Sequence, residues 1–320
     1  MKVDGLHHVT AITADVEANL DFYARLLGLR FVWQGVNADD PEMRHVAYGD
    51  ERGTPGSVIT FFDMPGVGRG RPGAGMVHRL IMRVADVAAL DFWERRLARG
   101  NVVLDRRADR LMFSDRDGLA LELVIDDGGD EPLVARAADV DERVAIRGIH
   151  GVRGYSADPE QSAPLLGDVL GMEPQSGGSW RARNEGRHSL LIYDEPPENP
   201  GQVGAGTMHH IAFTIRDGDE HRWRDRVADF GLRPTPVLDR KMAKSVYFRE
   251  PSRVLFELAT DQPGFVFEAA DSLGESLVLV GDLEDRRAEL EQRFPPLANP
   301  RAGTTATGQT DARHGHNYRR

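Results

Sequence analysis

Cysteine is absent from the 320 residues of the chain. Disulfide bonds, thiolate metal ligands and a cysteine nucleophile are therefore excluded, and any metal site has to use nitrogen and oxygen ligands from histidine, aspartate or glutamate. Long apolar runs are absent as well, since no stretch approaches the roughly 18 residues that a membrane-spanning helix needs. The chain begins Met1-Lys2-Val3 without the basic and apolar regions of a signal peptide, so we expect a cytoplasmic protein with no membrane partner.

An excess of positive charge is also lacking. The chain has 40 Lys and Arg against 51 Asp and Glu, for a net charge of -11 at pH 7, and the acidic residues are spread along its length. Because nucleic acids and anionic membranes attract basic surfaces, this balance disfavours both as partners. We expect the substrate to be a small molecule.

A repeated pattern organises the chain, which is longer than one ordinary core supports. Four segments each begin with a strand-like run that carries a histidine. These runs are Leu6-His7-His8-Val9-Thr10, Val77-His78-Arg79-Leu80, Ile149-His150-Gly151-Val152 and Met208-His209-His210-Ile211. Each run is followed by an aspartate that is suited to cap a helix, and then by apolar residues at helical spacing. The aspartates are Asp15, Asp86, Asp158 and Asp217.

Each predicted helix ends at a glycine, which accepts the left-handed conformation that closes a helix. The glycines are Gly28, Gly100, Gly171 and Gly231, and each lies 21 or 22 positions after the first histidine of its segment. Pro164 should shorten or kink the third helix. Short β-rich runs follow each glycine, such as residues 31–36, 44–48 and 57–62 in the first segment. Each segment is therefore predicted to form a strand, a helix and then three strands.

The four modules predict an α+β protein of two domains. We place the first pair of βαβββ modules at residues 1–135 and the second pair at residues 145–265. A C-terminal extension at 266–297 should contain a helix over 283–294, which the two prolines after it would stop. The tail at 298–320 has almost no large apolar residue, so we expect it to be disordered.

Only the first and fourth modules carry a second histidine beside the first. The four residues in this position are His8, Arg79, Gly151 and His210. Glu122 in the second module and Glu257 in the fourth interrupt apolar strand runs, where a charge is costly unless it is paired or bound to a cation. Pairing of modules one and four brings both second histidines together with a glutamate. Modules two and three would then form the other half, with Arg79 as the partner of Glu122 and no metal.

His8, His210 and Glu257 are thus predicted to hold one metal ion. Two histidines and one carboxylate on one face leave coordination positions open, which is typical of non-haem Fe(II) oxygenases. Mn(II) also accepts this set of ligands. We therefore expect Fe(II), with Mn(II) as the alternative.

With this triad in four such modules, the chain resembles the vicinal oxygen chelate superfamily, which includes glyoxalases and extradiol dioxygenases. More narrowly, it is similar to the ring-cleaving dioxygenases that open hydroquinones and chlorinated hydroquinones. The similarity rests, in order, on Gly5-Leu6-His7-His8-Val9-Thr10, Gly53-Thr54-Pro55-Gly56, Ile59-Thr60-Phe61-Phe62, Met208-His209-His210, Asp239-Arg240-Lys241, Tyr247, Phe256-Glu257, Pro263-Gly264-Phe265 and Ser272-Leu273-Gly274. The resemblance implies that the module pairs form two incomplete β-barrels.

The resemblance also implies a substrate pocket lined by His7, Thr10, Arg240 and Tyr247. Strict strand alternation would place His7 on the opposite face from His8, so a pocket role for His7 requires a local bulge or twist. Arg240 has a counterpart in the second module within the run Leu104-Asp105-Arg106-Arg107, which leaves open a structural role common to both modules. Tyr247 aligns with either Met112 or Phe113, so its hydroxyl group occurs only in the metal-bearing copy.

The reaction implied by the resemblance is insertion of O2 beside a hydroxyl group of a hydroquinone-type ring, with a small aromatic molecule and O2 as the reaction partners. Three alternatives stay open: a catechol extradiol dioxygenase, a glyoxalase-like metal-dependent lyase or isomerase, and a non-catalytic resistance protein that binds aromatic compounds. The sequence also leaves the oligomeric state open, including a homo-oligomer.

Overall fold

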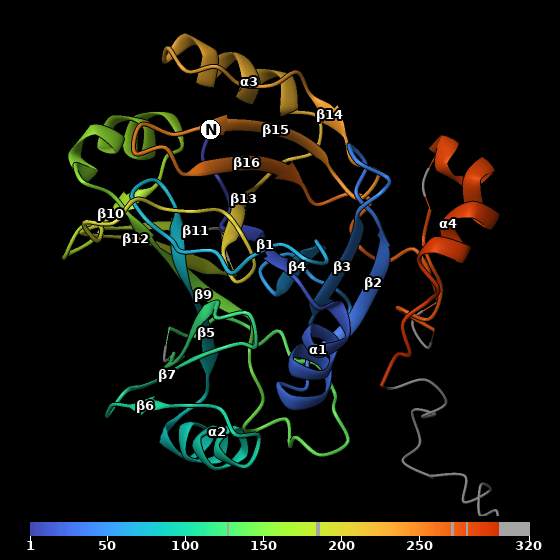
Figure 1. Cartoon of the computed structure of the whole chain (residues 1–320). Helices are drawn as coiled ribbons and strands as arrows, with labels where there is room; N and C mark the ends of the chain where they lie inside the picture. The colour runs from blue at the N-terminus through green and yellow to red at the C-terminus, as the bar shows by residue number, and fades with distance from the viewer. Residues whose placement is uncertain (127, 184–185, 270–271, 280, 301–320) are drawn as a thin grey trace, which may run out of the picture.

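Two eight-stranded sheets form the centre of the molecule (Figure 1). The computed structural model describes residues 1–126, 128–183, 186–269, 272–279 and 281–300. The first sheet has the strand order β14 (Leu238–Asp239), β15 (Lys244–Arg249), β16 (Leu255–Thr260), β13 (Met208–Ile215), β1 (Leu6–Thr13), β4 (Val58–Asp63), β3 (Arg44–Gly49) and β2 (Arg30–Val36). The second has the order β10 (Glu173–Pro174), β11 (Ser179–Arg183), β12 (His188–Asp194), β9 (Ile149–Tyr155), β5 (Val77–Val84), β8 (Ala120–Ile125), β7 (Arg110–Ser114) and β6 (Asp105–Arg106).

Each sheet combines one module from the first half of the chain with one module from the second half. The first sheet joins module one to module four through the antiparallel pair β1 and β13, and the second joins module two to module three through the antiparallel pair β5 and β9. The predicted α+β fold and the predicted pairing of modules are therefore confirmed. The domain limits at 1–135 and 145–265 stay a prediction, and each sheet takes strands from both ranges.

The first histidine of every module is a bulge residue. In the β1–β13 ladder, Leu6 and His8 pair with consecutive residues of β13, so His7 is skipped, and the shift on the other strand skips His209. The β5–β9 ladder skips His78 and His150 in the same way. An extra residue on one strand turns the side chains around it and increases the local twist. The bulge that a pocket role for His7 requires is therefore present.

Helices cover the outer faces of both sheets (Figure 1). The α-helices are α1 (Val16–Leu20), α2 (Val87–Arg99), α3 (Glu220–Asp229) and α4 (Arg287–Arg293). The 3-10 and π elements are η1 (Asp21–Leu26), η2 (Pro159–Ser162), η3 (Leu165–Val169) and η4 (Gly281–Arg286). In the third module the α-helical part is only two residues long, at 163–164. Its turns η2 and η3 flank Pro164, as expected of a residue that cannot donate a backbone hydrogen bond.

Two of the four predicted helix caps form. Asp15 and Asp86 each accept a hydrogen bond from a backbone amide in the first turn of the helix that follows. Asp158 precedes η2 without a side-chain cap bond. The prediction for Asp217 was wrong, because α3 begins two residues later, with Asp219 at its N-cap. The glycine prediction also fails once, since Gly100 has a negative φ and Asn101 takes the left-handed conformation at φ 57°.

The C-terminal extension packs along β2 and contains the predicted helix, which begins as η4 and continues as α4 (Figure 1). Leu277 and Leu290 join Val36 in a small apolar cluster, and Val278 forms a backbone bridge with Gly35. The expected disorder at 298–320 concerns almost only residues 301–320, which lie outside the described residues. Among the described residues, no helix combines the length and the apolar character that crossing a membrane requires.

Candidate metal centre

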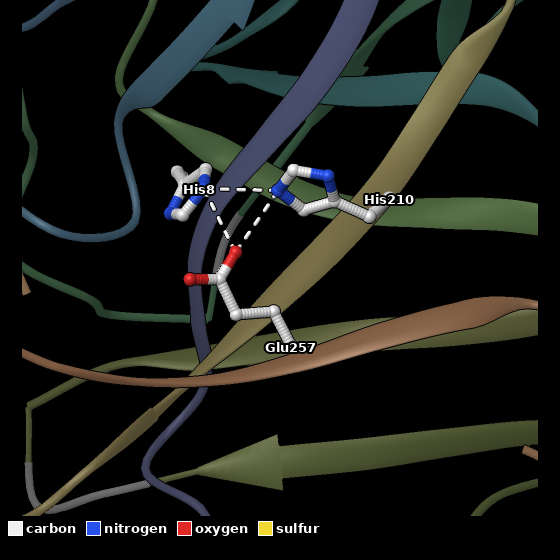
Figure 2. Close-up of side chains that lie close together, drawn as sticks. All are labelled: His8, His210 and Glu257. Atoms are coloured by element: carbon white, nitrogen blue, oxygen red, sulfur yellow. Dashed lines mark hydrogen bonds and ion pairs between the residues drawn. The ribbon is translucent and has the colours of Figure 1, made fainter. Parts of the chain in front are cut away.

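His8, His210 and Glu257 meet on neighbouring strands of the first sheet (Figure 2). His8 lies on β1, His210 on β13 and Glu257 on β16, and these three strands are adjacent in the sheet. The three residues are buried, with exposed fractions of 6%, 5% and 2%. Side chains that point to one face of adjacent strands lie within contact distance, so the strand order brings residues from both ends of the chain together.

Three ligand atoms form a small triangle (Figure 2). The Nε2 atoms of His8 and His210 are 3.4 Å apart, and the Oε2 atom of Glu257 lies 3.3 Å from the first and 2.9 Å from the second. Three adjacent ligands of an octahedral ion with bonds of about 2.1 Å are separated by about 3.0 Å. The observed separations therefore fit one ion bound by all three residues.

Each of the two site histidines touches the histidine that precedes it. The Nδ1 atoms of His7 and His8 are 2.9 Å apart, and those of His209 and His210 are 2.8 Å apart. One nitrogen of each contact has to donate and the other to accept. If His8 and His210 are the donors, both carry their proton on Nδ1 and leave the Nε2 lone pair free. This tautomer is the one that a metal ion at Nε2 needs.

In that arrangement three lone pairs converge without a proton between them. The Oε2 atom of Glu257 is buried and makes no hydrogen bond of regular geometry, although both Nε2 atoms lie close to it. Burial lowers the pKa of His210, which favours the neutral ring. Burial alone would raise the pKa of Glu257, but the positive charge that a protonated His8 or His210 ring places beside it outweighs this effect and holds that pKa well below its ordinary value. A bound metal ion would supply positive charge at the same place. The cluster is therefore suited to a cation.

Thr10 and Tyr247, two of the residues that the family resemblance assigns to a substrate pocket, stand beside the triangle. Thr10 pairs with His210 across the ladder, and its Oγ1 atom is 2.9 Å from His210 Nε2 and 2.8 Å from Thr60 Oγ1. Tyr247 pairs with Glu257 across the β15–β16 ladder, and its ring centroid is 5.5 Å from that of His210.

Arg240 and His7 also adjoin the site. Arg240 follows β14 and places its guanidinium carbon 5.2 Å from the centroid of the Tyr247 ring. His7 is fully buried behind His8, and burial next to His8 lowers its pKa to about 3. His7 thus contacts His8 directly and faces the triangle only through it.

Three residues near the site were not predicted to belong to it. His209 contacts His210, and its place in the same repeat column as His7 would have indicated this. Phe265 packs its ring 5.6 Å from that of His8 and lies within one of the runs on which the family resemblance rests. Asp39 forms an ion pair with Arg240, but nothing in its exposed loop sequence indicates this contact.

Comparison with known proteins shows the family to which the chain belongs. Residues 5–127 and 148–258 match the model of the Glyoxalase/Bleomycin resistance protein/Dioxygenase superfamily. The chain belongs to this superfamily. The crystal structure of a protein from Bacillus subtilis, provisionally described as a dioxygenase, matches with a TM-score of 0.84 at 38% identity, over 93% of this chain and 98% of that one.

Two curated relatives have names that describe an activity. MhqO of Bacillus subtilis (strain 168), provisionally named a ring-cleaving dioxygenase, is 39% identical over 92% of this chain and 97% of its own length. The chlorohydroquinone/hydroquinone 1,2-dioxygenase of Sphingobium indicum is 29% identical over 90% of this chain and 95% of its own length. The superfamily member described here is therefore similar over nearly its full length to proteins named as ring-cleaving dioxygenases.

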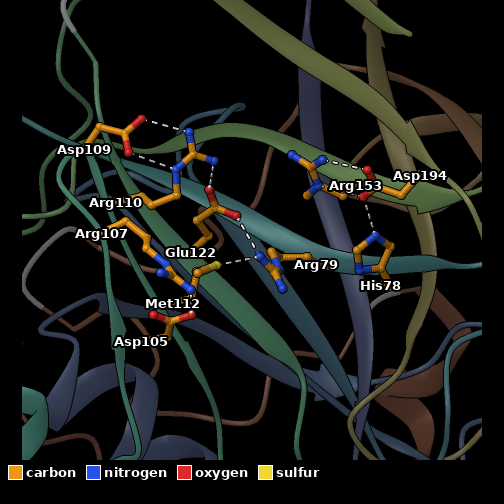
Figure 3. Close-up of polar contacts among 10 residues, drawn as sticks. All are labelled: His78, Arg79, Asp105, Arg107, Asp109, Arg110, Met112, Glu122, Arg153 and Asp194. Atoms are coloured by element: carbon orange, nitrogen blue, oxygen red, sulfur yellow. Dashed lines mark hydrogen bonds and ion pairs between the residues drawn. The ribbon is translucent and has the colours of Figure 1, made fainter. Parts of the chain in front are cut away.

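The second sheet has the equivalent strand order, but different side chains lie at the position that corresponds to the metal site (Figure 3). Glu122 occupies the position of Glu257 but accepts from Arg79 Nη1 at 3.1 Å and from Arg110 Nη1 at 2.9 Å. Met112 pairs with Glu122 as Tyr247 pairs with Glu257, which resolves the alignment of Tyr247. Arginine side chains thus neutralise the buried carboxylate in the half that lacks the two histidines.

A second group of metal-binding side chain types lies elsewhere on this sheet and consists of Asp126, His150 and His188. The buried Arg83 guanidinium places Nε 3.1 Å from a carboxylate oxygen of Asp126 and also pairs with Asp130. Asp130 in turn lies 3.0 Å from His188 Nδ1. Because a permanent cation already neutralises these carboxylates, the group is less suited to a metal ion than the triangle in the first sheet.

Loss of one ligand should empty the predicted metal site. We expect purified protein to contain about one Fe or Mn per chain and the His210→Ala variant to lose it, since two ligands hold a divalent ion far less well than three. Metal analysis by mass spectrometry of the purified proteins measures this. Glu122→Gln is the matched control and should keep its metal, because that carboxylate binds arginines. Full metal content in His210→Ala would contradict the assignment.

Removal of Arg79 should destabilise the fold without affecting the metal. Arg79→Met leaves the buried Glu122 with only the partly exposed Arg110 as a partner. We expect a loss of about 2 kcal/mol in the free energy of unfolding, less than for a fully buried pair because Arg79 is partly exposed. Urea unfolding measures the change. The double variant Arg79→Met with Glu122→Gln should recover most of the loss, and an unchanged midpoint in the single variant would contradict the pairing.

Proposed function

We propose that this protein is an Fe(II)-dependent dioxygenase that opens the ring of a hydroquinone or a related phenol. The observation that carries the proposal is the convergence of the His8 and His210 Nε2 atoms and one Glu257 oxygen within 3.4 Å of one another. The similarity to proteins named as ring-cleaving dioxygenases supports the reaction class. A small phenol and O2 are then the reaction partners.

The ligand set supports iron. Two imidazoles and one carboxylate on one face are typical of non-haem Fe(II) oxygenases, and the chain has no cysteine that would favour a softer metal. When bound, the ion acts as a Lewis acid toward a phenol oxygen and supplies electron density to O2. Mn(II) accepts the same set and is the alternative.

Tyr247 is the proposed hydrogen-bond donor of the pocket. The pKa of Tyr247 is raised well above its ordinary value, first because the phenol is buried and then because the Glu257 carboxylate lies near, and these effects outweigh Arg240. The hydroxyl group therefore keeps its proton at neutral pH and can donate a hydrogen bond to an oxygen of the substrate or of the opened ring. A donor held in a buried site stabilises charge as it develops there.

Thr10 offers a second hydroxyl group beside the ligands. In the metal-free arrangement its Oγ1 atom can donate to the Nε2 lone pair of His210 at 2.9 Å. Once that lone pair is used by an ion, the Thr10 proton becomes available to the substrate, and Thr60 at 2.8 Å holds the hydroxyl group in place. Thr10 is therefore proposed to orient the bound phenol.

Arg240 and Phe265 are proposed to orient the ring. The two hydroxyl groups of a hydroquinone lie para to each other, so only one of them can reach the metal and the other has to be recognised by side chains. Arg240 lies over the Tyr247 ring, where its guanidinium can donate a hydrogen bond to the second phenol oxygen. Phe265 is buried against the rings of His7 and His8 and supplies an apolar wall that excludes water.

Oxygen consumption by the iron-loaded protein tests the proposal. After anaerobic loading with Fe(II), we expect uptake of about one O2 per molecule of hydroquinone or chlorinated hydroquinone, because both oxygen atoms enter the ring-opened product. An oxygen electrode and the loss of the aromatic absorbance measure this. A panel that includes catechols distinguishes the catechol alternative.

The panel can also refute the proposal. Turnover of a glutathione hemithioacetal without oxygen uptake would favour a glyoxalase-like enzyme. Tight binding of aromatic compounds without turnover would favour the resistance-protein alternative.

Tyr247→Phe should reduce catalysis and leave folding intact. The substitution removes only the hydroxyl group, so we expect turnover to fall by about a hundredfold or more, as for the loss of a hydrogen-bond donor to developing charge, with the melting temperature within a few degrees of the original. Steady-state oxygen uptake and thermal unfolding measure the two effects. Met112→Leu, at the corresponding position of the second sheet, is the control and should leave turnover unchanged. A large drop in melting temperature for Tyr247→Phe would identify a packing residue instead.

A further inference from the structure

The loop between β2 and β3 reaches across the first sheet to Arg240. Asp39 in this loop accepts from Arg240 Nη1 at 2.5 Å and from Nη2 at 2.7 Å, one oxygen for each nitrogen. The two residues are separated by 201 positions, so the contact joins module one to module four. A bidentate pair fixes the plane of the guanidinium as well as its position.

The contact is the outer end of a series of side-chain contacts that ends at the proposed metal site. The side chain of Asp39 is 67% exposed, that of Arg240 is 16% exposed and that of Glu257 is 2% exposed. Arg240 lies 5.2 Å over the Tyr247 ring, and the Tyr247 ring lies 5.5 Å from that of His210. Asp39 therefore contacts Arg240 from the solvent side, and Arg240 contacts Tyr247 on the side of the metal site.

The loop that carries Asp39 is itself anchored. The backbone amide of Asp39 donates to Asn37 Oδ1 at 2.9 Å. Glu42, further along the loop, pairs with Arg286 and Arg293 of the C-terminal extension. These contacts hold the loop in place and therefore fix the position of the Asp39 carboxylate.

Among the described residues, which leave out 184–185 in the corresponding loop between β11 and β12, the second sheet shows no such contact. Arg106 occupies the position of Arg240 in the repeat, but it pairs with Asp91 and Glu94 on helix α2 of its own module. In the part of the chain that the structure describes, the arginine paired with the other module is therefore the one in the half that carries the two histidines. This difference favours a role at the site over a structural role common to the modules.

We propose that Asp39 is a positioning residue that orients Arg240 over the substrate and, by neutralising it, makes the site select phenols with uncharged ring substituents. The proposal rests on the proposed function, because it concerns the phenol that the site accepts. An arginine without a partner has many side-chain conformations, and ordering it on substrate binding opposes binding. The Asp39 carboxylate beside Arg240 also repels a second carboxylate on the ring.

The test compares Asp39→Asn with Asp40→Asn. Asp40 is the adjacent exposed aspartate, and among the described residues it forms no ion pair, so both variants lose one negative charge from the same loop. The two probes are hydroquinone and 2,5-dihydroxybenzoate, which is a hydroquinone that carries a carboxylate. Binding is measured by calorimetry without oxygen, and turnover by oxygen uptake, with metal content determined for each preparation.

For Asp39→Asn we expect kcat/KM for hydroquinone to fall by about tenfold, as for the loss of a group that orients the substrate. We expect the preference for 2,5-dihydroxybenzoate over hydroquinone to rise by about tenfold in both binding and turnover, because Arg240 is left with an unpaired charge. Asp40→Asn should behave as the original protein. Asp39→Glu, which keeps the charge, should restore the preference for hydroquinone even if its kcat stays low.

Equal preference ratios in Asp39→Asn and Asp40→Asn would overturn the proposal. So would a failure of Asp39→Glu to restore the ratio, since the negative charge would then not determine it. If the original protein binds both phenols but consumes no oxygen, the proposed reaction is wrong, and the binding ratios alone still decide the role of Asp39. If it binds neither phenol, both proposals fail.

Discussion

The antiparallel pairing of β1 with β13 is the contact on which the rest of the site depends. It places Thr10 opposite His210, which lies 200 positions later, and sets His8 and His210 on one face beside β16 with Glu257. A shift of one residue between β1 and β13 would turn the side chains of one strand to the other face of the sheet. The ligand triangle therefore forms only in the observed register. The pairing is also the least local part of the first sheet, and closing so long a loop is entropically unfavourable. A cation bound by residues of both strands would stabilise the closed arrangement.

The second sheet provides an internal comparison. It has the same strand order and the same bulged histidines, yet its buried Glu122 is neutralised by Arg79 and Arg110. Each half has a carboxylate on an apolar strand, and the two halves neutralise its charge in different ways. The guanidinium groups neutralise Glu122 permanently and leave no open position for a reactant. Two neutral imidazoles with free Nε2 atoms leave the charge to be neutralised by an ion.

Much of this arrangement follows from the sequence because it depends on periodic signals. The recurring histidine, the helix-ending glycine and the two positions with His8 and His210 predict four modules and the pairing of the first with the fourth. The bulges are not predictable in the same way, because they depend on which strand residue is skipped in the ladder. Asp217 fails as a cap because α3 begins two residues later than its periodic pattern suggests. The contact of Asp39 with Arg240 joins two loops far apart in the chain, and no local pattern predicts such a contact.

The central claim is that one ion lies between His8, His210 and Glu257 and that the second sheet holds none. Crystals of the protein grown anaerobically with Fe(II) would test it through anomalous scattering recorded on either side of the iron absorption edge. The account predicts one strong peak per chain, bordered by the two Nε2 atoms and the Glu257 carboxylate. A peak at Asp126, His150 and His188 instead, or no peak in a crystal whose solution retains its iron, would contradict it.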